Sequence, residues 1–282
     1  MQVVKKIGEL RNIIKQEKIK GNKIGFVPTM GYLHDGHLSL IKKSKEDNDV
    51  TVCSIFVNPT QFGPGEDLDK YPRDIERDMK LLKENKCDIL FYPDVKEMYP
   101  NGFYTKVTLS ILTDKLCGKS RPGHFDGVAT VVTKLINIVN PDSAYFGMKD
   151  YQQLLVIKRV VEDLNLDVNI VGCPIVREND GLAMSSRNVY LTEKERESAL
   201  SLSKSFKLVS QLIEKGIKNP QEIKQEVCKF IETHPFTKID YVELVDIDTL
   251  ENLNELKDKF LLALAVFVGK ARLIDNKIFE IK

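Results

Sequence analysis

The sequence predicts an α/β fold: a Rossmann-like, doubly wound parallel sheet followed by a smaller C-terminal α+β domain. In the first part of the chain, short apolar runs alternate with amphipathic helical patterns, which is typical of a parallel sheet covered by helices. After residue 176 the pattern changes to two long helices and then several strands. The length of 282 residues also favours two domains, since one domain usually takes about 150 residues.

The first βαβ unit contains two clear strand signals. Residues 23–28 (KIGFVP) form an apolar run closed by proline, and residues 50–57 (VTVCSIFV) form a run rich in β-branched residues. Between them, an apolar stretch followed by charged residues predicts a helix that begins near Gly36. The alternation then continues with predicted helices at 73–85, 128–139 and 151–164, and with predicted strands at 88–92, 144–146 and 168–172.

The C-terminal part begins with a helix signal. Thr192 followed by Glu195 is a capping-box pattern and predicts a helix over residues 192–215. The further elements are a helix at 220–232, strands at 241–245 and 260–268, and a hairpin in which Asp275 and Asn276 turn between residues 271–274 and 278–281. We therefore place the domain boundary at residue 176, between a parallel-sheet domain of residues 1–176 and a smaller helix-plus-antiparallel-sheet domain of residues 177–282.

Composition excludes several classes of protein. Lys and Arg number 42 against 41 Asp and Glu, so there is no overall positive charge to attract nucleic acid or an anionic membrane. The longest apolar run, residues 260–268, is too short to span a bilayer, and the first residues lack a signal peptide's apolar core. We expect a cytoplasmic protein. The cysteines are widely spaced and odd in number, so we expect reduced, mostly buried thiols at Cys53, Cys87, Cys117, Cys173 and Cys228.

The most informative segment is the turn that joins the first strand to the first helix (PTMGYLHDGH). His34 and His37 are three residues apart, so both can face one ligand at the start of a helix. Gly31 and Gly36 allow close approach of a nucleotide, and the free amides of a helix start favour phosphate. An ordinary surface connection is the alternative. A zinc site is a poorer one, because zinc-binding helices usually place histidines four residues apart.

Four other polar segments are weaker signals when taken singly. Residues 58–62 (NPTQF) suit a small polar ligand but also ordinary turn chemistry. Residues 118–127 (GKSRPGHFDG) suit a phosphate-binding loop or a flexible surface loop. In residues 147–153 (GMKDYQQ), Asp150 could hold a cation or cap the helix, and residues 184–188 (MSSRN) could close over a triphosphate or be a polar linker. Because most of these segments follow strands of one sheet, a single active site is favoured.

These motifs resemble those of a known family. The turn at His34 to His37, combined with Met184 to Arg187 downstream, resembles the nucleotidyltransferase superfamily, which includes the class I aminoacyl-tRNA synthetases. The chain resembles the pantothenate synthetase family over nearly its whole length. The resemblance lies in five segments, in this order: PTMGYLHDGHLSL, SIFVNPTQF, KSRPGHFDGVATVV, FGMKDYQQL and VRENDGLAMSSRN. One departure is Met148, where an acidic residue is expected.

The resemblance implies particular site residues. His37, His34 and Lys149 would be catalytic, Asn58, Gln61 and Gln153 would bind pantoate or β-alanine, and Asp78 and Asp150 would assist Mg²⁺. The implied ATP-binding residues are Met30, Gly31, Tyr32, Leu33, His34, Asp35, Gly36, His37, Gly147, Met148, Lys149, Asp150, Val176, Met184, Ser185, Ser186 and Arg187.

The resemblance also implies a reaction and partners. A pantoyl adenylate would form from pantoate and Mg-ATP with release of pyrophosphate, and β-alanine would then displace AMP. The implied partners are these small molecules and a second copy of the chain in a homodimer, with no nucleic acid or membrane. The alternatives are a neighbouring nucleotidyltransferase, which would keep the nucleotide in its product, and an RNA-binding module, which the balanced charge disfavours.

Overall fold

The computed structural model describes residues 1–281, which form two compact units. The first comprises residues 1–113, 121–148 and 153–174. The second comprises residues 175–281 together with two short segments from earlier in the chain, residues 114–120 and 149–152. The second unit therefore includes Lys149, which lies two residues beyond the end of a strand of the first unit.

The first unit is built on a parallel sheet, as the sequence predicts. Within the described residues its strands lie in the order β1-β4-β3-β2-β5-β6, and each neighbouring pair is parallel. The sequence analysis did not predict β1, which is only three residues long. The strands are β1 (Gln2–Val4), β2 (Ile24–Thr29), β3 (Val50–Ile55), β4 (Ile89–Phe91), β5 (Ser143–Gly147) and β6 (Asn169–Cys173).

Helices connect these strands in two directions. From β2 the chain passes through α2 to β3 on one side, whereas from β4 it returns through α6 to β5 on the other side of β2. Because such crossovers are right-handed, α2 and α6 lie on opposite faces of the sheet. The helices of this part are α1 (Ile7–Ile19), α2 (Asp35–Asp47), α3 (Ile75–Glu84), α4 (Val95–Met98), α6 (His124–Val139) and α7 (Tyr151–Asp163), with the short 3₁₀ turn η1 (Pro59–Gln61). The 3₁₀ turn η2 (Met148–Asp150) precedes α7, and residues 149–152 belong to the second unit.

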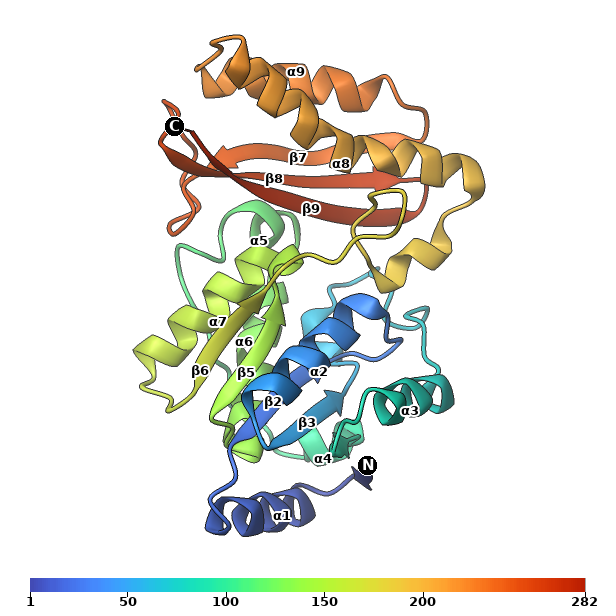
Figure 1. Cartoon of the computed structure of the whole chain (residues 1–282), viewed down its shortest axis with the longest axis vertical. Coiled ribbons are helices and arrows are strands. Elements are labelled where there is room, and N and C mark those ends of the chain that lie inside the picture. The colour runs from blue at the N-terminus through green and yellow to red at the C-terminus, as the bar shows by residue number, and fades with distance from the viewer. Residues whose placement is uncertain (282) are drawn as a thin grey trace. The chain divides into compact units, whose positions relative to one another are not determined.

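The strand order locates the ligand-binding edge of this sheet. Strand β2 pairs with β3 on one side and with β5 on the other, so the direction of winding reverses between β2 and β5 (Figure 1). Open α/β sheets bind ligands at such a switch point, beyond the carboxyl ends of the strands. The segment that follows β2 is the turn that contains His34 and His37, and Met148 follows the end of β5.

The second unit contains an antiparallel sheet of β7 (Thr237–Val245), β8 (Lys259–Val268) and β9 (Ala271–Glu280). Helices α8 (Glu193–Glu214) and α9 (Pro220–Glu232) pack on one face of it, as Figure 1 shows. The unit also includes α5 (Leu116–Ser120) and the 3₁₀ turn η3 (Ser186–Tyr190). The predicted capping box is present, since Thr192 accepts from the Glu195 amide and Glu195 accepts from the Thr192 amide.

The predicted hairpin at Asp275 and Asn276 is wrong. Both residues lie inside the continuous strand β9, where they pair with Leu264 and Ala263 of β8. The β8–β9 turn instead falls at Gly269, whose φ is +56°. Asp and Asn favour turns because their side chains bond to nearby backbone. Here tertiary partners satisfy those side chains, so the turn preference is overridden.

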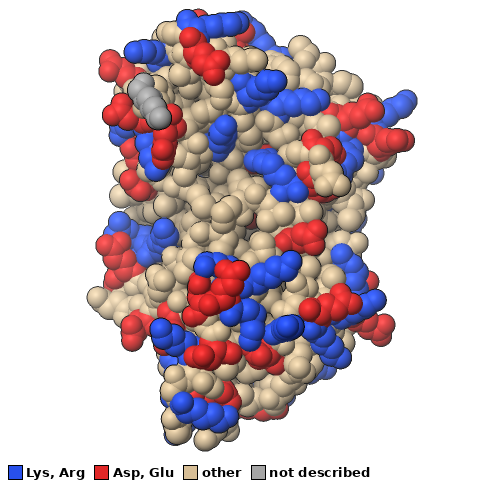
Figure 2. Space-filling model, in the orientation of Figure 1, with Lys and Arg blue, Asp and Glu red and all other residues tan. Residues whose placement is uncertain are grey.

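The surface and the thiols agree with the composition. On the face in Figure 2, basic and acidic side chains are intermixed. None of the helices in residues 1–281 is long and apolar enough to cross a membrane. The prediction of mostly buried thiols is confirmed, because all five cysteines are free and four are buried. Burial raises the pKa of the Cys87 thiol to about 12, which keeps it neutral.

The corrected turn generates a stability prediction. A Cβ on Gly269 would overlap Glu195 Oε1, so Gly269→Ala should break the α8 capping box as well as strain the backbone. Gly216 also has a positive φ, of +85°, but nothing within 4 Å of an added Cβ. Gly216→Ala should therefore cost about 1–2 kcal/mol in free energy of unfolding, and Gly269→Ala about 1 kcal/mol more. Urea denaturation measures both; equal losses would show that Gly269 does not contact the cap.

Candidate active site

The turn between β2 and α2 is held by a buried carboxylate. Asp78 of α3 is 1% exposed, and its two oxygens accept hydrogen bonds from the Tyr32 and Leu33 amides, both at 2.7 Å. Gly31 has a φ of +83°, and a Cβ there would lie 2.9 Å from an Ile55 methyl group. The turn thus needs glycine at position 31 and a double acceptor beneath it.

Two histidines cap the helix that follows this turn. His34 is the N-cap of α2, and its Nδ1 accepts from the Gly36 amide at 3.1 Å. His37 Nδ1 accepts from the His34 amide at 3.3 Å, and the ring centroids lie 4.0 Å apart. A ring nitrogen that accepts carries no proton, so both neutral rings carry their proton on Nε2. The capping bonds therefore fix the direction of two neighbouring Nε2–H donors.

The setting of Asp78 bears on its predicted role with a metal. Burial raises the pKa of this carboxyl, although the two amide bonds and Arg77, 3.8 Å away, act in the opposite direction. Both oxygens already accept backbone hydrogen bonds. The geometry thus gives Asp78 the function of positioning the histidine turn. Its assistance to Mg²⁺ stays a prediction.

The segment after β3 lies at the same edge as the histidine turn. Asn58 is 1% exposed, and its Nδ2 donates to Gln61 Oε1 at 3.2 Å. Gln61 Nε2 is 3.0 Å from the sulfur of Met30, which belongs to the histidine turn. The expected proximity of the two segments is confirmed. Because sulfur is a weak hydrogen-bond acceptor, Gln61 Nε2–H can exchange this contact for a hydrogen bond to a substrate oxygen.

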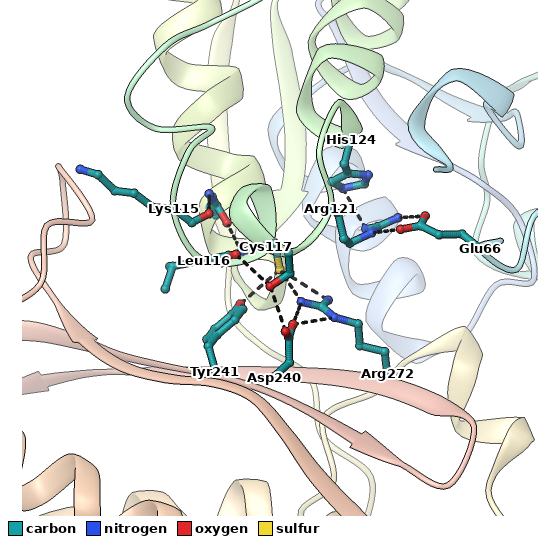
Figure 3. A network of polar contacts seen from close by, with 11 residues as sticks. Glu66, Lys115, Leu116, Cys117, Arg121, His124, Asp240, Tyr241 and Arg272 are labelled. Carbon is teal, nitrogen blue, oxygen red and sulfur yellow. Dashed lines mark hydrogen bonds and ion pairs between the residues drawn. The ribbon is translucent and has the colours of Figure 1, made fainter. Parts of the chain in front are cut away.

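The main chain of Gln61 is supported by residues 118–127, a segment whose composition suits either a phosphate-binding loop or a surface loop. His124 Nδ1 donates to the Gln61 carbonyl at 2.8 Å, and Arg121 donates to His124 Nε2 at 3.1 Å. A carbonyl only accepts and a guanidinium only donates, so His124 is neutral with its proton on Nδ1. Arg121 also makes a bidentate ion pair with Glu66, at 2.7 and 2.6 Å (Figure 3). These contacts position Gln61.

The Arg121 contact also sets the charge of Glu66. Partial burial alone would raise the pKa of the Glu66 carboxyl, but the hydrogen bonds and charge of Arg121 outweigh it. The pKa therefore lies below its ordinary value of 4.5. Glu66 stays ionised at neutral pH and keeps Arg121 oriented toward His124.

The second unit carries the remaining candidate residues. Lys149 lies in the η2 turn, its side chain is 18% exposed, and its Nζ is 3.9 Å from the Asp150 carboxylate. Its main-chain carbonyl accepts from Asn276 Nδ2 at 2.8 Å. The Asp150 side chain is 47% exposed, which leaves it accessible to a cation.

The loop that contains the MSSR residues is closed at its base. The Met184 amide donates to the Val176 carbonyl at 3.0 Å, and Arg177 makes a bidentate ion pair with Asp275 of β9 at 2.7 and 3.0 Å. Ser185 then caps η3 by accepting from the Arg187 amide at 3.3 Å. Strand β9 thus contacts both this loop and the Lys149 turn.

A further network fixes α5 in the second unit. The side-chain amide of Gln152 accepts from the Cys117 amide at 2.9 Å and donates to the Lys115 carbonyl at 2.7 Å. Figure 3 shows Cys117 beside Tyr241 and Arg272, and Arg272 pairs with Asp240 at 2.6 Å. This network links Gln152 and α5 to the antiparallel sheet within the second unit.

Comparison with known proteins identifies the family. The family model for pantoate-beta-alanine ligase matches residues 2–278. The chain belongs to the pantoate-beta-alanine ligase family. It is 61% identical to the pantothenate synthetase of Caldicellulosiruptor bescii over 282 residues, covering 100% of both chains. It is 57% identical to that of Acetivibrio thermocellus over 281 residues, again covering 100% of both.

Solved structures of the family have the same fold. A pantothenate synthetase from Thermus thermophilus is similar with a TM-score of 0.93 and 46% identity, over 98% of this chain and 99% of that one. A pantoate-beta-alanine ligase from Francisella tularensis, complexed with beta-gamma ATP and beta-alanine, is similar with a TM-score of 0.81 and 38% identity, over 99% and 97%. The predicted membership of this ligase family and the predicted fold are confirmed.

The structure groups the predicted residues of this ligase by unit. Residues 30–37 lie with Asn58, Gln61 and Asp78 in the first unit, and Lys149 and Asp150 lie with Val176 and residues 184–187 in the second. Gln153 is half-buried in the first unit.

Several supporting residues were not predicted, because their roles depend on partners distant in sequence. Glu66 and Tyr99 (which donates to Asn58 at 2.8 Å) fall outside every sequence motif, and Asn276 was predicted only as a turn residue. Arg121, His124 and Gln152 lie inside the polar segments 118–127 and 147–153, which the sequence marks as candidates for ligand binding.

The Glu66 ion pair generates a pH-dependent prediction. Glu66→Gln should lower the free energy of unfolding by about 1–2 kcal/mol near pH 7, because Arg121 loses its charged partner. Since the folded-state pKa is lowered, this contribution is complete above 4.5 and is lost as the pH falls through the folded-state value. The difference from the unsubstituted protein should therefore narrow in acid. Denaturation at several pH values measures it.

A matched control is Glu46→Gln in the same unit. Glu46 is 67% exposed and pairs with Lys43 at 3.5 Å, so its loss should cost less than about 0.5 kcal/mol. A Glu66→Gln cost no larger than that of the control would contradict the proposed support of Gln61.

Proposed function

We propose that this chain joins pantoate to β-alanine in an ATP-dependent reaction that passes through a pantoyl adenylate. Family membership supports the reactants, and the Francisella tularensis relative was solved with beta-gamma ATP and beta-alanine. The observation that carries the adenylate step is the histidine pair, whose two Nε2–H donors are fixed side by side by the capping bonds. Such donors suit charge that develops on a phosphoryl group.

The reaction has two steps. In the first, a pantoate carboxylate oxygen attacks the α-phosphorus of ATP, and the bond to the β-phosphate breaks to release pyrophosphate. In the second, the β-alanine amine attacks the acyl carbon, loses a proton and expels AMP. Neither step needs a covalent bond to the protein, so the protein acts by positioning and charge stabilisation.

Residues of the first unit would act on the α-phosphate and on pantoate. His34 and His37 donate to the α-phosphoryl oxygens, and the glycines of their turn allow close approach of the nucleotide. Gln61, Gln153 and Asn58 bind pantoate through neutral amides. Because an amide forms no ion pair with the pantoate carboxylate, the carboxylate stays nucleophilic.

Residues of the second unit would act on the other phosphates. Lys149 supplies a point charge, and Ser185, Ser186 and Arg187 donate to the β- and γ-phosphate oxygens. Val176 and Met184 line the nucleotide. The capped η3 turn and the closed loop base restrict the conformations available to these donors.

Mg²⁺ fits the residues present. This ion usually keeps several waters and takes only one or two carboxylates together with substrate phosphates, so one accessible carboxylate near a phosphate-binding lysine is sufficient. Asp150, 47% exposed and beside Lys149, meets that requirement, and Asp78 meets it less well. Bound Mg²⁺ would neutralise phosphate charge.

The family resemblance also supports three broader proposals. We propose that the chain forms a homodimer, that it acts in the cytoplasm, and that residues 1–176 and 177–282 act as separate domains. Light scattering of the purified protein measures the oligomeric state directly.

The proposed reaction predicts which bond of ATP is broken. Protein incubated with ATP, magnesium, pantoate and β-alanine should produce equal amounts of pantothenate, AMP and pyrophosphate, measured by mass spectrometry. ADP and phosphate as the main nucleotide products would contradict adenylation. A product that retains AMP would instead indicate a nucleotidyltransferase.

The different roles proposed for Lys149 and His37 predict different losses of rate in the two steps. Lys149→Ala and His37→Ala should each slow pantothenate formation from ATP by about 100- to 1,000-fold, the usual cost of losing a preorganised donor. When preformed pantoyl adenylate is supplied with β-alanine, pyrophosphate is absent, so Lys149→Ala should recover much of its rate. His37→Ala should recover less, because its phosphate remains. Equal loss in both steps for Lys149→Ala would refute this assignment.

A further inference from the structure

Strand β9 carries two adjacent buried polar residues near its middle. Asp275 is 2% exposed and Asn276 is 6% exposed, and both pair with apolar residues of β8. Burial of a carboxylate and an amide is unfavourable unless both are hydrogen-bonded. Apolar side chains at these two positions would build a purely structural strand at a lower cost in free energy. The hydrogen-bond partners of Asp275 and Asn276 therefore indicate what the two residues do.

Asn276 contacts the main chain of Lys149. Its Nδ2 donates to the Lys149 carbonyl at 2.8 Å, across 127 positions of sequence. Lys149 lies in the short η2 turn that leads into α7. A lysine ammonium lies at the end of a flexible four-carbon chain, so its position depends on how firmly the backbone of the lysine is held. The Asn276 amide provides that restraint.

Asp275 holds the strand and the MSSR loop together. Its Oδ1 accepts from the Asn276 amide at 2.8 Å, and the same carboxylate binds Arg177 in a bidentate ion pair. Arg177 also donates to the Gly181 carbonyl at 3.1 Å. Burial raises the pKa of Asp275, while the charges of Arg177 and Lys149 act against that rise. Asp275 and Asn276 thus support both the η2 turn, which carries Lys149, and the 177–187 loop, which carries Arg187.

We propose that Asn276 is a positioning residue for the ligation reaction, which acts by fixing the Lys149 main chain on strand β9. Asp275 keeps Asn276 in place and ties the 177–187 loop to the same strand. The inference rests on the proposed function, because it assigns a task to Lys149 in phosphate binding. Strand β9 of the antiparallel sheet then helps to place a group that is proposed to act on ATP. Displacement of such a group by about 1 Å can lower the reaction rate roughly 100-fold.

The test is a double-mutant cycle between Asn276 and Lys149. Asn276→Leu keeps a similar side-chain volume and removes the donor; we expect kcat/KM for ATP to fall about 10-fold, the effect of one lost hydrogen bond. In a Lys149→Ala background the same change should alter the rate by less than about 2-fold, because the group it positions is already absent. Single-turnover release of pyrophosphate measures all four proteins.

The control is Thr237→Val, a change in the same unit. Thr237 Oγ1 donates to the Ile231 and His234 carbonyls at 3.0 and 2.8 Å, so the variant also loses side-chain-to-carbonyl bonds. It should lower the melting temperature and leave kcat/KM unchanged in both backgrounds. If Asn276→Leu does not fold, Asn276→Ser replaces it; its shorter side chain cannot make the 2.8 Å bond but keeps a polar group in the strand.

The outcomes separate the two proposals. Full activity of the Asn276 variants, or an equal loss in both Lys149 backgrounds, would overturn the positioning role while the ligase activity stands. If the unsubstituted protein makes no pantothenate and AMP, the proposed function fails and this inference fails with it.

Discussion

The carboxylate of Asp78 is the constraint on which the candidate site of the first unit depends. Two consecutive amides of the β2–α2 turn point at its two oxygens, and this satisfies donors that would otherwise be buried without partners. The turn so fixed places His34 at the start of α2, where the His34 ring accepts from the Gly36 amide and the His37 ring accepts from the His34 amide. The direction of both imidazole donors therefore follows from one buried acid on α3.

The same principle recurs throughout both units. Gln61 is held through its carbonyl by His124, which Arg121 and Glu66 orient in turn. Lys149 is held through its carbonyl by Asn276. In each case a polar group from elsewhere in the same unit restrains the backbone of a residue that is proposed to meet substrate. Sites built in this way lose little energy to reorganisation when charge develops.

Much of the fold and the family could be predicted from the sequence. Periodic apolar runs determined the parallel sheet, and local signals such as Thr192 with Glu195 located helix starts, because both depend on residues close together in the chain. Helix α1 gave no such signal: its N-cap, Lys6, makes no side-chain cap, and the Ile7 amide donates instead to Glu97 at 2.9 Å. A cap supplied from 90 positions away leaves no local pattern.

The sequence by itself marked the residues that we propose to carry the chemistry, since the histidine turn, the glutamines and the MSSR loop are contiguous motifs. Only the tertiary structure decided what holds them. Asp275 and Asn276 have the composition of a turn, yet they form part of a strand because Arg177 and the Lys149 carbonyl satisfy their side chains. Local preference for a turn is worth about 1 kcal/mol or less, and two buried tertiary contacts outweigh it.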